Sequence, residues 1–375
     1  MEEWKLTKIG KICRKVCSGG TPKSTVDEYY GGGIPWLNTK EVNFNRIYST
    51  ESTITETGLQ NSSAKWIDKH AVIIAMYGAT AAKCAIVMIP MTTNQACCNL
   101  MIDEKQADYR FVYYSIANAY SKLASLANGG AQQNLNAQLI KDFEIPLPSI
   151  FTQRKIANIL TAIDDKIELN NRINHNLEQT ADEILIDAIH NHTIKKDSLN
   201  SICCYVKDRV DCGILDNEKY VSTDSMKSNK GGIELSSSVP DGKCISFIQK
   251  DVLVSNIRPY FKKIWQATNK GGCSNDVLCF RSTNNTPSVL YHLLRSDSFF
   301  DYVMTGAKGS KMPRGDKSQI MKWEVPLFKP NYLYNLEKQL SVIDNSVSLN
   351  DLENKRLTVL RDTLLPSLFN GHINC

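Results

Sequence analysis

The sequence predicts an α+β protein built from two copies of one unit, each a globular part followed by a long helix. Three observations support this class: internal similarity between the two halves, a heptad pattern at the end of each copy, and short β-branched and aromatic runs before it. At 375 residues the chain has room for two or three domains, and 42% apolar residues allow each to bury a core. Disordered and fibrous proteins are therefore excluded.

The internal repeat is clearest where residues 138–185 align with residues 318–365. This alignment contains 13 identities over 48 positions, whereas composition alone gives about three. The separation of the aligned residues, here called the repeat offset, is about 180 residues, which is too long for a solenoid repeat. The sequence therefore indicates a pseudo-two-fold duplication of a whole domain pair.

A heptad seam of mostly apolar residues runs through the end of each copy. Its positions step alternately by four and three residues from Ile156 to Ala188, and again from Leu336 to Leu368. An ordinary core helix carries a similar stripe, but two matching seams with a 3.5-residue period favour a coiled coil.

Four seam positions are asparagines, where Leu or Ile would pack better. They are Asn170, Asn174, Asn350 and Asn354, and the two pairs are separated by the repeat offset. Our hypothesis is that these amides face one another and fix the helix register, because a slipped helix would leave a buried amide without a partner. The alternative is that the seam opens locally to solvent.

Composition divides the chain into globular parts at residues 1–150 and 191–328 and long helices at residues 151–190 and 329–375. We expect one clear helix late in each globular part. The net charge is +2 and +6 for the globular parts, −3 for the first helix and 0 for the tail. This distribution is expected if the globular parts bind a polyanion and the first helix binds protein.

The cysteines and the apolar runs favour a cytoplasmic protein without a membrane partner. The chain opens with two acidic residues instead of a secretory leader, so the 12 cysteines are expected to be reduced thiols. Residues 71–90 are the most apolar stretch, but polar and glycine interruptions predict two short buried strands and no membrane span.

No motif for catalysis or for a metal or cofactor site is recognisable. The sequence contains no C-x-x-C, G-x-x-x-x-G-K-[ST], G-x-G-x-x-G or H-E-x-x-H. A cysteine–histidine site could assemble in three dimensions, but scattered cysteines among apolar residues are more often core residues. We therefore expect no catalytic residues and no cofactor in this chain.

Two loops in each copy are rich in side chains that contact nucleic acids: one follows a central strand, and the other precedes the exit from the globular part. Glycines let the backbone approach a phosphate, lysines attract it, and Gln, Asn and Arg make bidentate contacts with adenine or guanine. A polar Gly-rich loop is normally a solvated turn, but here both loops recur in both repeats. The candidate residues are Tyr77, Thr80, Lys83, Gln132, Gln133 and Asn134 in the first copy and Asn256, Arg258, Tyr260, Lys262, Lys263, Lys308, Lys311 and Arg314 in the second.

Four segments resemble the specificity subunits of type I restriction-modification systems. Residues 143–181 resemble the central segment of that family, residues 19–42 the opening of its target-recognition domains, residues 305–328 the close of the second such domain, and residues 361–373 the C-terminal end. The resemblance implies two target-recognition domains, each reading half of a bipartite site on double-stranded DNA. It also implies an antiparallel coiled coil that acts as a ruler.

The same resemblance implies partner subunits that carry the chemistry. Two methyltransferase subunits and restriction subunits would dock on this chain, with S-adenosylmethionine, ATP and Mg bound to those partners and none of them here. Two alternatives remain open: a coiled-coil adaptor whose globular ends bind protein or another ligand, and a specificity subunit of a fused cleavage-methylation enzyme.

Overall fold

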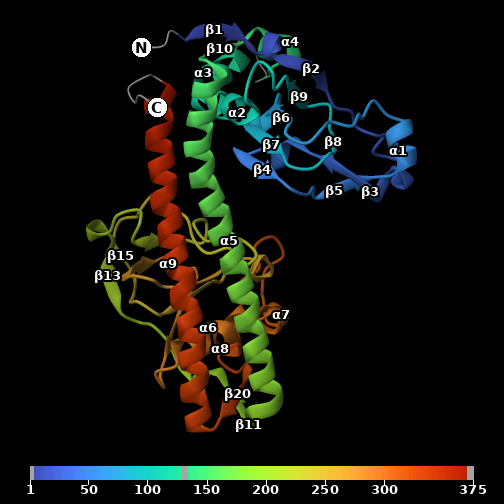
Figure 1. The fold of residues 1–375 in the computed structure, drawn as a ribbon. Coiled ribbons are helices and arrows are strands. Elements are labelled where there is room, and N and C mark those ends of the chain that lie inside the picture. The colour runs from blue at the N-terminus through green and yellow to red at the C-terminus, as the bar shows by residue number, and fades with distance from the viewer. Residues whose placement is uncertain (1–3, 129–133, 370–375) are drawn as a thin grey trace. The chain divides into compact units, whose positions relative to one another are not determined.

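The computed structural model describes residues 4–128 and 134–369. Contacts divide the chain into two units: unit 1 comprises residues 1–168 and 354–375, and unit 2 comprises residues 169–353. Each unit contains one globular part and a stretch of both long helices (Figure 1). The predicted α+β class with two similar globular parts is confirmed.

Unit 1 is built on a five-stranded sheet with the strand order β2-β9-β6-β7-β4. Its strands are β2 (Cys13–Ser18), β4 (Asn45–Ile47), β6 (Val72–Ala75), β7 (Cys84–Val87) and β9 (Cys97–Ile102). The central strand β6 pairs antiparallel with β7 and β9, and every residue of β6 and β7 is buried. The prediction of two short buried strands within residues 71–90 is therefore confirmed.

Both faces of this sheet are covered. Ile74 packs with Phe111 and Ile116 on the helical side, and Ile73 packs with Leu37 on the side of a second, three-stranded sheet. The remaining elements of the globular part are β1 (Lys5–Lys8), β3 (Tyr30–Leu37), β5 (Ser52–Ile54), β8 (Thr92–Thr93), β10 (Glu144–Leu147), α1 (Glu56–Gln60), α2 (Tyr109–Asn118), α3 (Tyr120–Ser125) and α4 (Ala137–Asp142).

Unit 2 repeats this plan with sheets ordered β12-β19-β16-β17 and β13-β15-β18-β14. Val254 of the central strand packs with Phe280 and Phe299 on the helical side, and Leu253 packs with Phe247 of the second sheet. The elements are β11 (Thr193–Ser198), β12 (Cys203–Tyr205), β13 (Arg209–Asp211), β14 (Tyr220–Val221), β15 (Lys243–Phe247), β16 (Val252–Ser255), β17 (Ile264–Gln266), β18 (Gly271–Cys273), β19 (Val277–Ser282), β20 (Glu324–Phe328), α6 (Pro287–Arg295), α7 (Asp297–Thr305) and α8 (Lys317–Ile320).

The repeat extends to unusual backbone conformations. Three positions of unit 1 have a positive φ that recurs one repeat offset later in unit 2, although the residue types differ: His70 (70°) and Lys250 (74°), Gly78 (75°) and Arg258 (49°), and Ala82 (67°) and Lys262 (50°). Residues other than glycine disfavour this left-handed region. The surrounding fold therefore dictates these turns more strongly than the local residue does.

The expectation of one helix late in each globular part is wrong. The structure has two consecutive helices there, α2 and α3 in unit 1 and α6 and α7 in unit 2, followed by a third short helix. In unit 2 the break lies at Ser296, whose backbone is extended and whose side chain accepts a hydrogen bond from the Phe299 backbone N–H. Serine is a preferred helix N-cap, so α7 begins anew at this residue.

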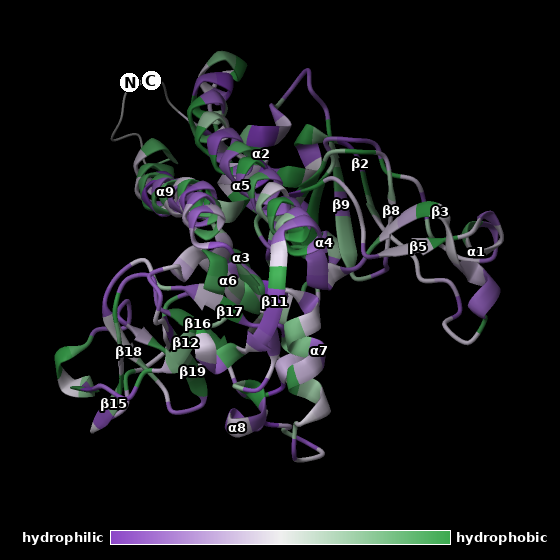
Figure 2. Ribbon diagram, turned by 90° about the horizontal axis from the view of Figure 1, so that it is seen from below, coloured by the Kyte–Doolittle hydropathy of each residue, from purple (hydrophilic) through white to green (hydrophobic). Residues whose placement is uncertain are grey.

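The long helices are α5 (Ile150–His192), with 43 residues, and α9 (Pro330–Phe369), with 40 residues. Hydrophobic and hydrophilic residues alternate along both helices (Figure 2), as a seam requires. In unit 2, Asn170 contacts Glu353 and Asn174 contacts Asp351, so residue numbers run in opposite directions and the pair is antiparallel. No helix in the described ranges is long and apolar enough to cross a bilayer.

Candidate nucleic-acid interface

The two loops singled out in the second copy meet in unit 2. One follows β16 and the other precedes α8, and they pair through an antiparallel bridge between Ile257 and Arg314. The Arg258 backbone N–H donates to the Pro313 carbonyl at 2.8 Å. Loops from distant parts of the chain therefore form one surface.

Unit 1 joins its two loops in the same way. Tyr77 and Asn134 form an antiparallel bridge, and the Leu135 backbone N–H donates to the Met76 carbonyl at 2.9 Å. Tyr77 and Asn134 precede the bridged residues of unit 2 by the repeat offset. The duplicated loops are thus placed by a duplicated contact, while Gln132 and Gln133 lie outside the described residues.

The side chains of these loops differ in how freely they reach solvent. Tyr77 and Tyr260 are exposed aromatic residues. Asn134, Lys308 and Lys311 are also exposed. Thr80 and Lys83 are half-buried, and Lys83 Nζ donates to Asn43 Oδ1 at 2.7 Å.

Lys308 Nζ lies 3.3 Å from Asp316 Oδ2, although its side chain is largely exposed. Lys262 and Lys263 have protein partners too. Lys262 Nζ lies 3.0 Å from Asp297 Oδ1, a carboxylate that it shares with Lys230, and the two ammonium groups hold the pKa of Asp297 below its ordinary value. Lys263 Nζ donates to the Thr223 carbonyl at 2.7 Å. A phosphate would have to compete with these partners, so both lysines contribute to loop structure.

Arg314 forms an ion pair that the sequence did not reveal. Its Nε lies 3.2 Å from Asp276 Oδ1 and its Nη2 lies 3.3 Å from Asp276 Oδ2, while half of the Arg314 side chain remains exposed. Asp276 immediately precedes β19, and its backbone carbonyl accepts the Asn256 N–H at 2.8 Å. The residue one repeat offset earlier is Ala96, so the repeat gave no signal for this carboxylate.

Asn256 and Arg258 combine burial with strain beside this pair. Asn256 is 6% exposed, and among the described residues neither its Oδ1 nor the buried Arg258 Nε has a hydrogen-bond partner. An unpaired buried polar atom costs about 1–3 kcal/mol. Arg258 also has the left-handed φ of 49°, and strain of this kind gathers at ligand-binding sites.

The seam asparagines form hydrogen bonds between α5 and α9. Their partners include acidic side chains as well as the amides that the sequence predicts. Asn350 Nδ2 donates to Asn174 Oδ1 at 2.7 Å, which is an amide pair of the kind proposed. Asn174 Nδ2 also donates to Asp351 Oδ1 at 2.9 Å, and Asn170 Nδ2 donates to Glu353 Oε2 at 2.8 Å. Acidic side chains thus share the polar part of the seam with the amides, and Asn354 there is half-buried.

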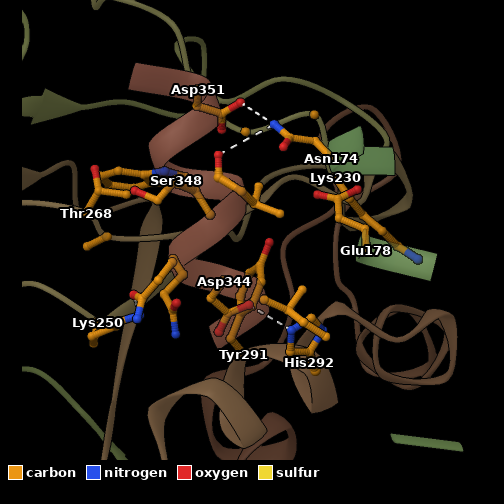
Figure 3. Close-up of a pocket in the computed structure, with 18 of the residues that line it drawn as sticks. Asn174, Glu178, Lys230, Lys250, Thr268, Tyr291, His292, Asp344, Ser348 and Asp351 are labelled. Atoms are coloured by element: carbon orange, nitrogen blue, oxygen red, sulfur yellow. Dashed lines mark hydrogen bonds and ion pairs between the residues drawn. The ribbon is translucent and has the colours of Figure 1, made fainter. Parts of the chain in front are cut away.

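A cavity of about 320 Å³ lies beside this seam within unit 2. Figure 3 shows Asn174 directed toward Asp351, and His292 directed toward Asp344 in the wall of the cavity. The lining carries carboxylates and lysines together, including Lys250. This mixture does not suit a polyanion, so the loops remain the candidate nucleic-acid surface.

Two buried cysteines, Cys98 and Cys203, are poorly suited to act as nucleophiles. Burial raises the pKa of the Cys98 and Cys203 thiols to about 12, which disfavours the nucleophilic thiolate at neutral pH. Within residues 4–128 and 134–369, no group of three or more His, Cys, Asp or Glu side chains is placed to hold a metal ion. The loops present hydrogen-bond donors and acceptors, positive charge and exposed aromatic rings.

Comparison with known proteins finds a family model that matches the N-terminal part of the chain. Residues 1–179 match the model of the type I restriction modification DNA specificity domain. The chain is 32% identical over 187 residues to the type I restriction enzyme MjaIX specificity subunit of Methanocaldococcus jannaschii, covering 49% of this chain and 43% of that one. It is 30% identical over 169 residues to the EcoR124I/EcoR124II specificity subunit of Escherichia coli, covering 43% and 41%.

These two alignments span about two fifths of each relative, but weaker similarity extends further. The MjaVIII specificity subunit of M. jannaschii is 21% identical over 420 aligned positions, covering 99% of this chain and 93% of that one. The crystal structure of a type I restriction-modification S subunit from M. genitalium superposes with a TM-score of 0.59 at 17% identity, covering 98% and 96%. That structure has the same fold, and the resemblance first seen in short segments is confirmed.

Proposed function

We propose, on the premise that residues 1–179 belong to the family of type I restriction modification DNA specificity domains, that this chain is a sequence-specific DNA-binding specificity subunit reading a bipartite site. The bridged loop pair carries the proposal, because it recurs in both units at positions separated by the repeat offset. The scaffold is the same in both units while the side chains differ. Two such surfaces suit two different half-sites.

The chain itself supplies recognition in this proposal, and its partners supply the chemistry. Two methyltransferase subunits and restriction subunits would bind S-adenosylmethionine, ATP and Mg. The proposed complex would act on double-stranded DNA in the cytoplasm. Absent catalytic motifs in the sequence support a non-catalytic role for this chain.

An exposed apolar stripe on α9 supports a protein partner. In unit 2, Val342, Leu349 and Leu352 are 60%, 66% and 46% exposed, and they are spaced at helical intervals outside the seam. Exposed apolar stripes on a helix are typical of protein-binding surfaces. We assign this stripe to the docking of the partner subunits.

We further propose that the four seam asparagines fix the register of α5 against α9. Asn174→Leu alone should lower the free energy of unfolding by about 1 kcal/mol, because the Asn350 amide loses its partner. The double variant Asn174→Leu/Asn350→Leu should recover only part of that loss, because Asp351 loses the Asn174 amide in both variants. A double-mutant cycle measures the coupling between the two amides. Additive effects in the cycle would show that the amide pair does not set the register.

The decisive test of the proposed function is methylome sequencing of a host with and without the gene. We expect one bipartite methylated motif to disappear with the gene. Exchange of residues 1–149 for the matching domain of another specificity subunit should then change one half of the motif and leave the other half intact. A change in both halves, or in neither, would contradict modular reading, and an unchanged methylome would favour the adaptor alternative.

A further inference from the structure

The backbone around Arg314 is unusually well fixed for a loop residue. Its N–H donates to the Lys308 carbonyl and its carbonyl accepts the Lys308 N–H, both at 2.9 Å. The bridge to Ile257 ties the same residue to the loop after β16. The backbone position from which the Arg314 side chain extends is therefore fixed by two contacts.

The side chain is oriented as well. Arg314 presents Nε and Nη2 to the two oxygens of Asp276 at 3.2 and 3.3 Å, which uses one edge of the guanidinium. A guanidinium carries five N–H groups in a rigid plane, so its other edge, formed by Nη1 and the second Nη2 hydrogen, keeps its donors. Two parallel donors of this kind match O6 and N7 of guanine in the major groove.

The Asp276 carboxylate also favours a base contact over a phosphate contact for Arg314. An arginine that meets phosphate acts largely through its net positive charge, and Asp276 offsets that charge. A donor edge of nearly neutral overall charge is better suited to a base edge. In unit 1 the corresponding residues are Ala96 and Asn134, so this arginine–aspartate pair is particular to unit 2.

We propose that Arg314 reads a guanine in the second half of the DNA site and that Asp276 is the positioning residue that aims it. The proposal rests on the proposed function and adds the base and the residue that set one position of the site. A surface ion pair of this exposure is worth little to folding. Its value therefore lies in holding the arginine.

The test uses the complete complex of this chain with its methyltransferase subunits, methylating a library in which each position of the bipartite site is randomised. Arg314→Lys keeps the charge but cannot pair with guanine through two parallel donors, so preference for one guanine in the second half should fall at least about tenfold. Asp276→Asn should weaken preference at the same position and leave the first half unchanged. Asp216→Asn is the control, because it removes the exposed ion pair with Lys219 at 2.6 Å, outside both loops.

The outcomes separate this proposal from the proposed function. If the unmodified complex shows no bipartite site, the proposed function fails. If it shows one, an equal loss at all sites for Arg314→Lys would mark a phosphate contact and overturn the guanine assignment. An unchanged base preference for Asp276→Asn would overturn the positioning role, and retained first-half preference shows that each variant is folded.

Discussion

In each unit, a side chain of a short helix contacts an aspartate of a long helix, a contact here called the clamp. The two aspartates are equivalent, but the side chains that contact them differ. In unit 1, Tyr114 Oη of α2 donates to Asp164 Oδ2 of α5 at 2.5 Å. In unit 2, His292 Nε2 of α6 lies 2.9 Å from Asp344 Oδ1 of α9, and the two aspartates are separated by the repeat offset. The side chain that meets the aspartate is therefore a tyrosine in one unit and a histidine, which can take up a proton near neutral pH, in the other.

Both units also bring an arginine to this region. In unit 1, Arg361 Nη1 of α9 lies 3.1 Å from Asp164 Oδ1. In unit 2 the arginine comes from the short helix. Arg295, three residues after His292, bonds Asp182 with Nη1 at 2.7 Å and Glu178 with Nη2 at 2.7 Å, both on α5. Aligning the two helices on their Tyr-Tyr and Tyr-His pairs places Ala117 at this position in unit 1. The two units therefore share one packing plan, while the polar contacts that join their helices use different residues.

Removal of Arg295 should change the free energy of unfolding more than any other substitution considered below. Arg295→Ala should lower the free energy of unfolding of unit 2 by about 2–3 kcal/mol, because a nearly buried cation leaves two carboxylates together. We place the loss below the range for fully buried pairs, because Asp182 and Glu178 are 43% and 30% exposed and water would solvate them.

Urea unfolding of the full chain measures this loss, and Arg172→Ala provides the control because Arg172 is an exposed residue of α5. The control should stay within about 0.5 kcal/mol of the parent protein. Equal losses in the two variants would show that Arg295 is not part of the clamp.

A smaller effect should follow from exchanging residues at the left-handed turn of the recognition loops. Arg258→Gly should raise the free energy of unfolding by about 0.5–1 kcal/mol, because glycine adopts a φ of 49° without the strain of a side chain. If Arg258 contacts DNA, the same substitution should also weaken recognition of the second half-site.

The reciprocal change can be made at the equivalent turn of unit 1. Gly78→Ala introduces a side chain at a φ of 75° and should lower the free energy of unfolding by about 1 kcal/mol. Thermal unfolding measures both variants. A loss of stability in Arg258→Gly would show that Arg258 stabilises its own loop, and the functional interpretation of its strain would be wrong.

The smallest expected effect is a difference in pH dependence between the units. Burial opposes the charge on His292, but Asp182 and Asp344 outweigh it and raise the pKa of His292 above its ordinary 6.5. The protonated histidine therefore stabilises unit 2 fully below about pH 6.5 and loses that contribution as the pH rises through the raised value. Burial raises the pKa of Tyr114 instead, so that residue stays neutral throughout.

His292→Tyr gives unit 2 the arrangement of unit 1. The melting temperature, measured between pH 5.5 and 8.5, should fall less with rising pH in this variant than in the parent protein. His190→Tyr alters an exposed histidine of α5 and should leave the slope unchanged. Parallel slopes for His292→Tyr and the parent would show that His292 is not the titrating group.

Features that repeat along the chain could be predicted from the sequence. The heptad seams and the repeat offset depend on local periodicity and internal similarity, and they located the long helices, the central strands and the paired loops. The break at Ser296 was missed because apolar residues continue across it, and only the capping bond reveals it. Periodicity therefore predicts an element more easily than its interruption.

Contacts particular to one unit could not be predicted in the same way. Asp276 meets Arg314 from 38 positions away, and Asp297 meets Lys262 from 35 positions away. Neither spacing has a helical or strand period. The polar partners that orient or occupy the candidate binding residues emerge only when tertiary packing brings the chain together.

The asparagines of the seam also matter while the protein is being made. The end of α5 at His192 and the start of α9 at Pro330 are far apart in the chain. Synthesis of the roughly 140 residues between them takes about 7–28 s at about 5–20 residues per second, and during this time α5 exists without α9. A continuous seam of Leu and Ile would let the α5 helices of neighbouring nascent chains associate. Burying the Asn170 and Asn174 amides without hydrogen-bond partners in such an association costs about 1–3 kcal/mol each. We therefore expect the polar seam to discourage premature association until Asn350 and Asp351 emerge to complete it.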